Sequence, residues 1–99
     1  MSETVQRFYD SQLTTEVKPY TTDFTDFIRS GASISAVAAS YAQTFGGPLS
    51  GSCAAGASAG SVTHVSPALS LAGSYTFNVT ATMSNSDVRR AIWFIRVDA

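Results

Sequence analysis

The chain has 99 residues, of which 44% are apolar and 11% aromatic, so it can form one globular domain with a modest core and is too apolar to be disordered. The net charge of -1 argues against a nucleic-acid binder that relies on a basic patch, and apolar runs of a few residues are too short to span a membrane. The single cysteine, Cys53, excludes an internal disulfide, and we expect synthesis in a reducing cytosol because the N-terminus has no apolar signal-peptide core.

The distribution of charge is more informative than its sum. All Lys, Arg, Asp and Glu residues lie within residues 1–29 and 87–98, and the stretch from Ser30 to Ser86 has none. A free soluble domain usually carries charges of both signs over its whole surface. The uncharged middle therefore favours a surface that neighbouring subunits cover. The alternative is a low-charge domain that its serines and threonines keep in solution.

Residues 1–12 are predicted to form an N-terminal arm, followed by a single domain over residues 13–99. The arm is too short for a stable isolated helix, and it carries the apolar or aromatic side chains of Val5, Phe8 and Tyr9. Two interpretations are open. The arm is either a frayed terminus or a segment that docks on a neighbouring subunit with Phe8 and Tyr9 as anchors.

Three segments with strand character follow in the first half of the chain. Residues 13–18 are a candidate strand that Pro19 ends, residues 20–28 alternate and then turn, and residues 33–41 form a strand after the bend at Gly31. Their aromatic, Thr-rich and alternating composition favours β-structure. In the second segment Tyr20, Thr22 and Phe24 are predicted to share one face. In the third segment Val37, Ala39 and Tyr41 are predicted to face the core.

Residues 46–60 hold five of the seven glycines, mostly separated by Ala and Ser. This composition cannot build a packed core by itself. The segment is either a flexible loop or two short strands whose small side chains let another chain approach closely. Residues 61–65 then predict a strand that Pro67 stops.

The C-terminal third is predicted to be an antiparallel hairpin that organises the fold. Residues 74–83 and 88–97 alternate between apolar and polar positions, and the polar run 84–87 between them is rich in turn-forming residues. The predicted inward stripe consists of Tyr75, Phe77, Val79, Ala81 and Met83 on the first strand and Ala91, Trp93, Ile95 and Val97 on the second. About seven short strands separated by turns predict an all-β, Ig-like antiparallel β-sandwich.

Three stretches resemble small Ig-like structural proteins of tailed bacteriophages, of the fibre–tail adaptor or minor virion protein type. They are the aromatic and acidic run 20–28 with the following Ser33-Ile34-Ser35, the run 73–80, and the run 89–97 that ends in Ile-Arg-Val. The resemblance covers most of residues 20–97. The chain departs from the family at Ala39, where the family often carries Trp, and in its small-residue segment 46–60.

This resemblance implies a non-enzymatic structural protein of a tailed-phage virion, made in the host bacterial cytoplasm. It would dock on other virion structural proteins as a tail or fibre adaptor or as a capsid decoration subunit, and it would be multimeric in the particle. Neither a nucleic acid nor a membrane is expected as its partner. The resemblance implies no catalytic residue and no cofactor.

The residues themselves also predict no catalytic, metal or cofactor site. Asp23 and Asp26 form the only close acid pair, but strand spacing would place them on opposite faces, so we expect a role in a turn. Calcium would need more oxygen ligands than this run offers. His64 is expected at the surface or at the rim of the core. Cys53 has no charged sequence neighbour that would lower its pKa.

The last strand predicts a contact surface. If Trp93 faces the core, Ile92 and Phe94 on the same strand face outward. Exposed apolar side chains of this size on an edge strand need a cover. Either the arm folds back over them or another subunit does. The second interpretation predicts an interface formed by Phe8, Tyr9, Ile92 and Phe94.

A different function is also open. An adhesion or carbohydrate-binding Ig-like module usually presents an aromatic platform, which Tyr41, Phe45 and Trp93 could supply. A third possibility, an Ig-like linker domain cut from a longer chain, is less favoured because the chain starts with Met1 and then shows a complete sandwich pattern.

Overall fold

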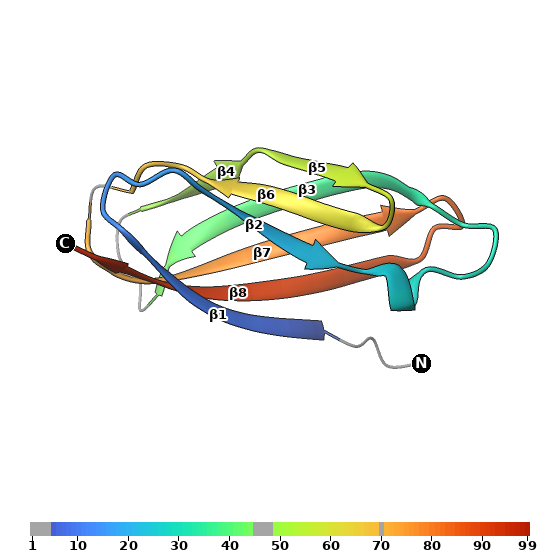
Figure 1. The fold of residues 1–99 in the computed structure, drawn as a ribbon, viewed down its shortest axis with the longest axis horizontal. Coiled ribbons are helices and arrows are strands. Elements are labelled where there is room, and N and C mark those ends of the chain that lie inside the picture. The colour runs from blue at the N-terminus through green and yellow to red at the C-terminus, as the bar shows by residue number, and fades with distance from the viewer. Residues whose placement is uncertain (1–4, 45–48, 70) are drawn as a thin grey trace.

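The computed structural model describes residues 5–44, 49–69 and 71–99, which form two β-sheets packed face to face. One sheet has five strands in the order β1-β8-β7-β3-β4, and the other has three in the order β2-β6-β5 (Figure 1). The strands are β1 (Val5–Leu13), β2 (Lys18–Asp23), β3 (Ile34–Gln43), β4 (Ser50–Cys53), β5 (Ala55–Ser58), β6 (Ser61–Ser66), β7 (Gly73–Met83) and β8 (Val88–Asp98). A short 3-10 helix, η1 (Thr25–Phe27), follows β2. The predicted Ig-like β-sandwich is confirmed.

The N-terminal segment differs from the predicted arm. From Val5 onward it is strand β1, which pairs with β8 along its whole length. Val5 lies opposite Arg90 at one end, and Leu13 lies opposite Asp98 at the other. This pairing is parallel, so the sandwich is not wholly antiparallel as predicted. The candidate strand over residues 13–18 is instead the end of β1 and the turn into β2. Residues 1–4 of the predicted arm lie outside the described residues.

The predicted C-terminal hairpin is β7 and β8, which lie side by side in the larger sheet (Figure 1). Every residue of the predicted inward stripe is buried, from Tyr75 to Met83 on β7 and from Ala91 to Val97 on β8. The turn is closed by the Asp87 backbone N–H, which donates to Asn85 Oδ1 at 3.1 Å. The alternation of apolar and polar residues therefore identifies both the strands and the face that they bury.

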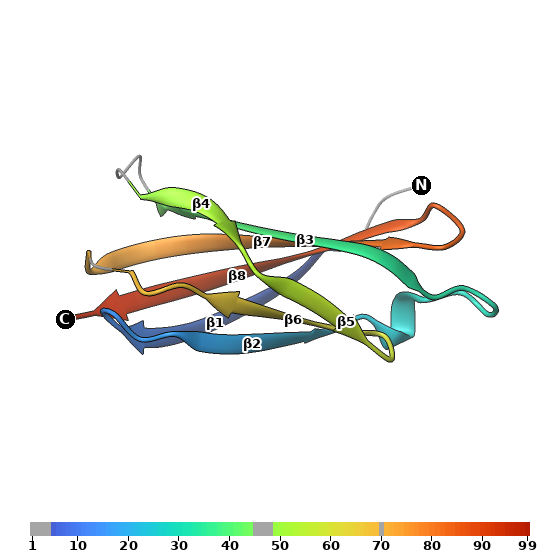
Figure 2. The same cartoon turned by 90° about the horizontal axis from the view of Figure 1, so that it is seen from above.

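The small-residue segment forms strands in the part that the structure describes. The two strands are consecutive, yet β4 belongs to the larger sheet and β5 to the smaller one, so the chain passes from one layer to the other between them (Figure 2). As a result, one of the two edge strands of each sheet has only four residues, and short edge strands resist unwanted strand pairing. Residues 45–48, at the start of the segment, lie outside the described residues.

Aromatic side chains connect the two sheets at the centre of the core. Trp93 of β8 donates its Nε1 hydrogen to Thr22 Oγ1 on β2 at 2.8 Å. The Trp93 and Tyr20 rings lie 5.1 Å apart, and the Tyr20 hydroxyl donates to Gln12 Oε1 at 2.8 Å. Ala39 of β3 is buried, and Trp93 supplies an indole to this core.

Replacing Thr22 by valine is expected to lower the free energy of unfolding by about 1–3 kcal/mol. Valine keeps the shape but leaves the buried Trp93 N–H without its acceptor. Chemical denaturation followed by Trp93 fluorescence measures the change. Thr21→Val is the matched control, because Thr21 is exposed and its hydroxyl bonds only to Thr63 at 2.9 Å. Equal stability of the two variants would contradict the assigned role of Thr22.

Candidate functional site

The acid pair has the predicted turn role. Asp23 Oδ1 accepts hydrogen bonds from the Thr25 hydroxyl and from the Thr25 backbone N–H, the latter at 2.8 Å. These bonds close the entry into η1. Both hydrogen bonds lower the pKa of the Asp23 carboxyl below its usual range, and the bond from the Thr25 hydroxyl has the larger effect. Asp23 is thus fully engaged in local structure.

His64 was predicted to lie at the surface or at the rim of the core, and this prediction is wrong. Its side chain is fully buried. Its imidazole is surrounded by three aromatic rings, with centroids at 5.4 Å for Tyr20, 5.5 Å for Phe77 and 5.6 Å for Trp93. Neither ring nitrogen has a hydrogen-bond partner among the described residues. Burial lowers the pKa of His64 to about 4, so the imidazole is neutral at neutral pH.

Cys53 is half-buried at the edge of the core, and burial raises the pKa of its thiol. A raised pKa decreases the thiolate fraction and with it the nucleophilicity. Across residues 5–44, 49–69 and 71–99, no three His, Cys, Asp or Glu side chains gather as they would around a metal ion. Over the same ranges, no helix is long and apolar enough to cross a membrane.

The four residues of the predicted interface divide between the two faces of the large sheet. Phe8 points inward and stacks on Trp93 with centroids 4.5 Å apart, so it contributes to the core. Ile92 and Phe94 point outward on β8, as predicted, and are partly exposed. Tyr9 points outward on β1, where its side chain is 76% exposed.

Tyr9 and Phe94 form the most prominent feature of this outer face. The parallel register places them side by side, and their rings stack with centroids 5.0 Å apart and an interplanar angle of 17°. The chain therefore covers part of Phe94 with its own β1 strand, but it does so with another aromatic ring that is itself exposed. We call Tyr9, Ile92 and Phe94 the aromatic face.

The aromatic platform considered for a carbohydrate-binding module is not formed by the residues proposed for it. Trp93 is only 8% exposed, because it points into the sandwich. Tyr41 is half-buried and lies against Phe77, with ring centroids 5.5 Å apart. Phe45 lies outside the described residues. Within the part of the chain that the structure describes, the outward aromatic pair is Tyr9, which is exposed, and Phe94, which is partly exposed.

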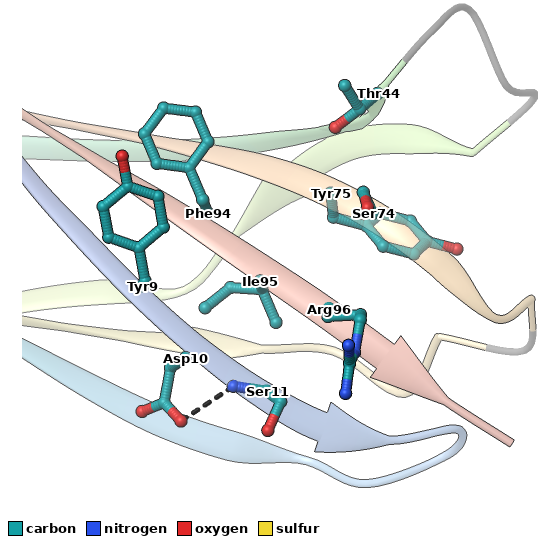
Figure 3. A pocket seen from close by; sticks show the side chains of 9 residues that line it. All are labelled: Tyr9, Asp10, Ser11, Thr44, Ser74, Tyr75, Phe94, Ile95 and Arg96. Atoms are coloured by element: carbon teal, nitrogen blue, oxygen red, sulfur yellow. Dashed lines mark hydrogen bonds between the residues drawn. The ribbon is translucent and has the colours of Figure 1, made fainter.

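A hollow of about 650 Å³ adjoins this pair. In Figure 3 the Tyr9 and Phe94 rings lie at one end of it, and Arg96 lies toward the end of β8 at the other. Ser11, Ser74 and Thr44 also line the hollow. Register places Ser11 and Ser74 on either side of Arg96, and these small residues leave the space open between larger side chains.

The charges on this face are mostly positive. Alternation along β1 and β8 places the side chains of Arg7, Arg90 and Arg96 on the outer side of the large sheet, together with one carboxylate, Asp98. Asp98 Oδ1 forms an ion pair with Arg96, with 3.1 Å between Oδ1 and Nε. The face is therefore basic although the whole chain has a net charge of -1.

The alternation of β8 correctly predicted that Ile92 and Phe94 face outward. The sequence did not indicate that Arg96, Ser74 and Thr44 line one hollow. The same alternation places Arg96 and Phe94 on one side of β8. The neighbouring strands could not be placed beside them, because the parallel pairing of β1 with β8 has no signature in the sequence.

No protein-family model matches the chain, and comparison with curated protein sequences finds no match. Among solved structures, the chain is similar to the Listeria monocytogenes protein InlP, with a TM-score of 0.59 and 15% identity over 97% of this chain and 28% of that one. It is also similar to a 2,6-sialyltransferase of Photobacterium sp. JT-ISH-224, with a TM-score of 0.53 and 15% identity over 99% of this chain and 18% of that one. This chain thus spans less than a third of either protein's length, and the two likenesses concern the β-sandwich fold alone.

Proposed function

We propose that the protein is a non-enzymatic structural subunit that docks on another protein through the aromatic face of its five-stranded sheet. The observation that carries this proposal is the exposed Tyr9–Phe94 stack. Tyr9 is 76% exposed, so its side chain contributes little to the stability of the fold. Its burial against a partner would instead contribute to the free energy of binding.

The composition of the face supports docking to a protein. Aromatic residues and arginine are enriched at protein interfaces, and the outer side of the large sheet carries Arg7, Arg90 and Arg96 beside the aromatic face. Next to it, β7 presents Thr76, Asn78 and Thr80, and β3 presents small residues such as Ser40. These uncharged side chains would be inexpensive to desolvate compared with lysines or glutamates.

We further propose that the partner is another structural protein of a tailed-phage virion. In this setting the protein would act as a tail or fibre adaptor or as a capsid decoration subunit, present in several copies. The resemblance of residues 20–97 to small Ig-like phage proteins supports the proposed location. The proposed virion location and the absence of enzymatic activity both follow from that resemblance.

Replacing Ile92 by aspartate is expected to lower the number of copies per particle by at least about tenfold, because an apolar contact is lost and a carboxylate must be desolvated on docking. Ile92 lies on the aromatic face between Arg7 and Asn78 and does not line the hollow. Quantitative immunoblotting of purified particles, after complementation with tagged protein, measures the copy number. Phe94→Asp is a second test at the same face.

Val17→Asp is the matched control, since Val17 is 62% exposed in the turn between β1 and β2 and away from the face. It should be incorporated like the unchanged protein. Trp93 fluorescence confirms that each variant is folded. Normal incorporation of folded Ile92→Asp and Phe94→Asp proteins would show that docking does not use this face.

A further inference from the structure

We propose that the hollow beside the Tyr9–Phe94 stack binds a carboxylate-bearing sugar unit of an acidic saccharide. This inference goes beyond docking on a protein. It concerns the end of the sheet face where Arg96 lies. Of the two docking variants, Ile92→Asp lies outside the hollow and so tests docking separately from this inference, whereas Phe94 lines the hollow. The hollow's volume of about 650 Å³ lies within the roughly 300–1,000 Å³ that is usual for small-molecule sites.

The aromatic end of the hollow suits the apolar side of a sugar ring. A pyranose presents polarised C–H groups on its face, and the electron-rich face of an aromatic ring attracts them. The Tyr9 and Phe94 rings are nearly parallel in their stack, at 17°, and each holds the other in position. A stacked pair is preorganised, so little side-chain entropy is lost when a ligand binds.

The opposite end of the hollow suits a carboxylate. Arg96 carries a planar guanidinium group, which can donate two parallel hydrogen bonds to a carboxylate. Its side chain is 72% exposed, and Asp98 Oδ1 lies 3.1 Å from its Nε as an ion-pair partner. Phe94 and Arg96 are two residues apart on β8, which corresponds to about 6.6 Å along a strand. One sugar ring and its carboxylate can bridge that separation.

Hydroxyl groups surround the space between the two ends. Ser11, Ser74 and Thr44 line it from three different strands or their ends, and Thr44 Oγ1 lies 3.3 Å from Thr76 Oγ1. Such hydroxyls both donate and accept hydrogen bonds, which matches the hydroxyls of a sugar. An apolar peptide side chain would leave them without partners, so the mixture of groups favours a saccharide over a purely apolar ligand.

Two carboxylates lie near the site, and each has a cationic partner. Asp10 lines the hollow, but its Oδ1 accepts from the Ser11 backbone N–H at 2.7 Å and faces Lys18 Nζ at 3.5 Å. Asp98 partly neutralises Arg96. Removal of the Asp98 charge should therefore strengthen the binding of an acidic saccharide, which is a distinctive prediction of this site.

The test is an amide chemical-shift titration of the uniformly ¹⁵N-labelled protein with two matched pairs of saccharides, up to about 10 mM, where dissociation constants in the millimolar range are measurable. The pairs are trigalacturonic acid with maltotriose, and sialyllactose with lactose. We expect an acidic member of at least one pair to shift the amides of Tyr9, Ser11, Thr44, Ser74, Phe94 and Arg96, and to bind at least about tenfold more tightly than its neutral counterpart.

Three variants then test the assigned roles. Phe94→Ala should abolish binding, Arg96→Gln should remove the preference for the acidic member, and Asp98→Asn should raise its affinity. Arg29→Gln is the control, because Arg29 is an exposed arginine that pairs with Asp87, outside the hollow. The proposal is overturned if neither acidic saccharide shifts these amides, if acidic and neutral members bind equally, or if Phe94→Ala leaves binding unchanged.

Discussion

Phe77→Ala is expected to lower the free energy of unfolding by about 3–5 kcal/mol, the cost of removing a large aromatic side chain from a packed core. Phe77 is fully buried on β7, in the middle of the larger sheet. Its ring lies 5.5 Å from that of His64 on the opposite sheet and 5.5 Å from that of Tyr41 on β3. The cavity would therefore separate the two layers at their centre.

Phe94→Ala is the matched control for this prediction. Phe94 has the same side chain and lies on the neighbouring strand, opposite Thr76, but points to the outside. Its replacement should cost no more than about 1 kcal/mol, the scale of one stacked aromatic pair. Urea denaturation of both variants measures the difference. A smaller loss for Phe77→Ala than for Phe94→Ala would mean that the inward and outward faces of the hairpin are assigned the wrong way round.

The stability of the protein is expected to fall by about 3 kcal/mol between pH 6.5 and pH 4 because of His64. In the unfolded chain the imidazole takes up a proton near its usual pKa of 6.5, whereas burial lowers the pKa in the folded protein to about 4. Above pH 6.5 the imidazole is neutral in both states, and its contribution to stability is complete. As the pH falls toward 4 only the unfolded state gains the proton, so the unfolded state becomes relatively more stable.

His64→Leu isolates this effect, because leucine has no titrating group. The denaturation free energy of the variant should vary with pH between 6.5 and 4 by about 3 kcal/mol less than that of the unchanged protein. The comparison of slopes does not depend on how well leucine packs between Tyr20, Phe77 and Trp93. Identical slopes for the two proteins would show that His64 is already protonated or solvated in the folded state.

The inward faces of the later strands could be predicted because neighbouring side chains of a strand point to opposite sides. This two-residue period separated Phe77 from Asn78 and Trp93 from Phe94, and the burial of these residues agrees with it. The same period correctly placed Tyr20 and Thr22 on one face of β2, and the structure shows that this face is the buried one. Turn chemistry located the hairpin, because the polar run 84–87 interrupts two alternating segments.

The position of His64 shows where this reasoning stops. The alternation of β6 places Val62, His64 and Ser66 on one face, so His64 could have been assigned to the core with Val62. Its polarity argued instead for the rim, because a buried imidazole usually has hydrogen-bond partners. Three aromatic rings from β2, β7 and β8 surround it, and that combination depends on how two sheets meet.

The sequence by itself determined the all-β class, the strands of the hairpin and the buried face of each, since these depend on local alternation and turn residues. The tertiary structure alone decided that β1 joins β8 in parallel, that Phe8 enters the core, and that Tyr9 stacks on Phe94 beside Arg96. The physical reason is that strand pairing between the two ends of a chain is set by the total packing of both sheets. A segment of nine residues carries no local signal for the strand that it will join.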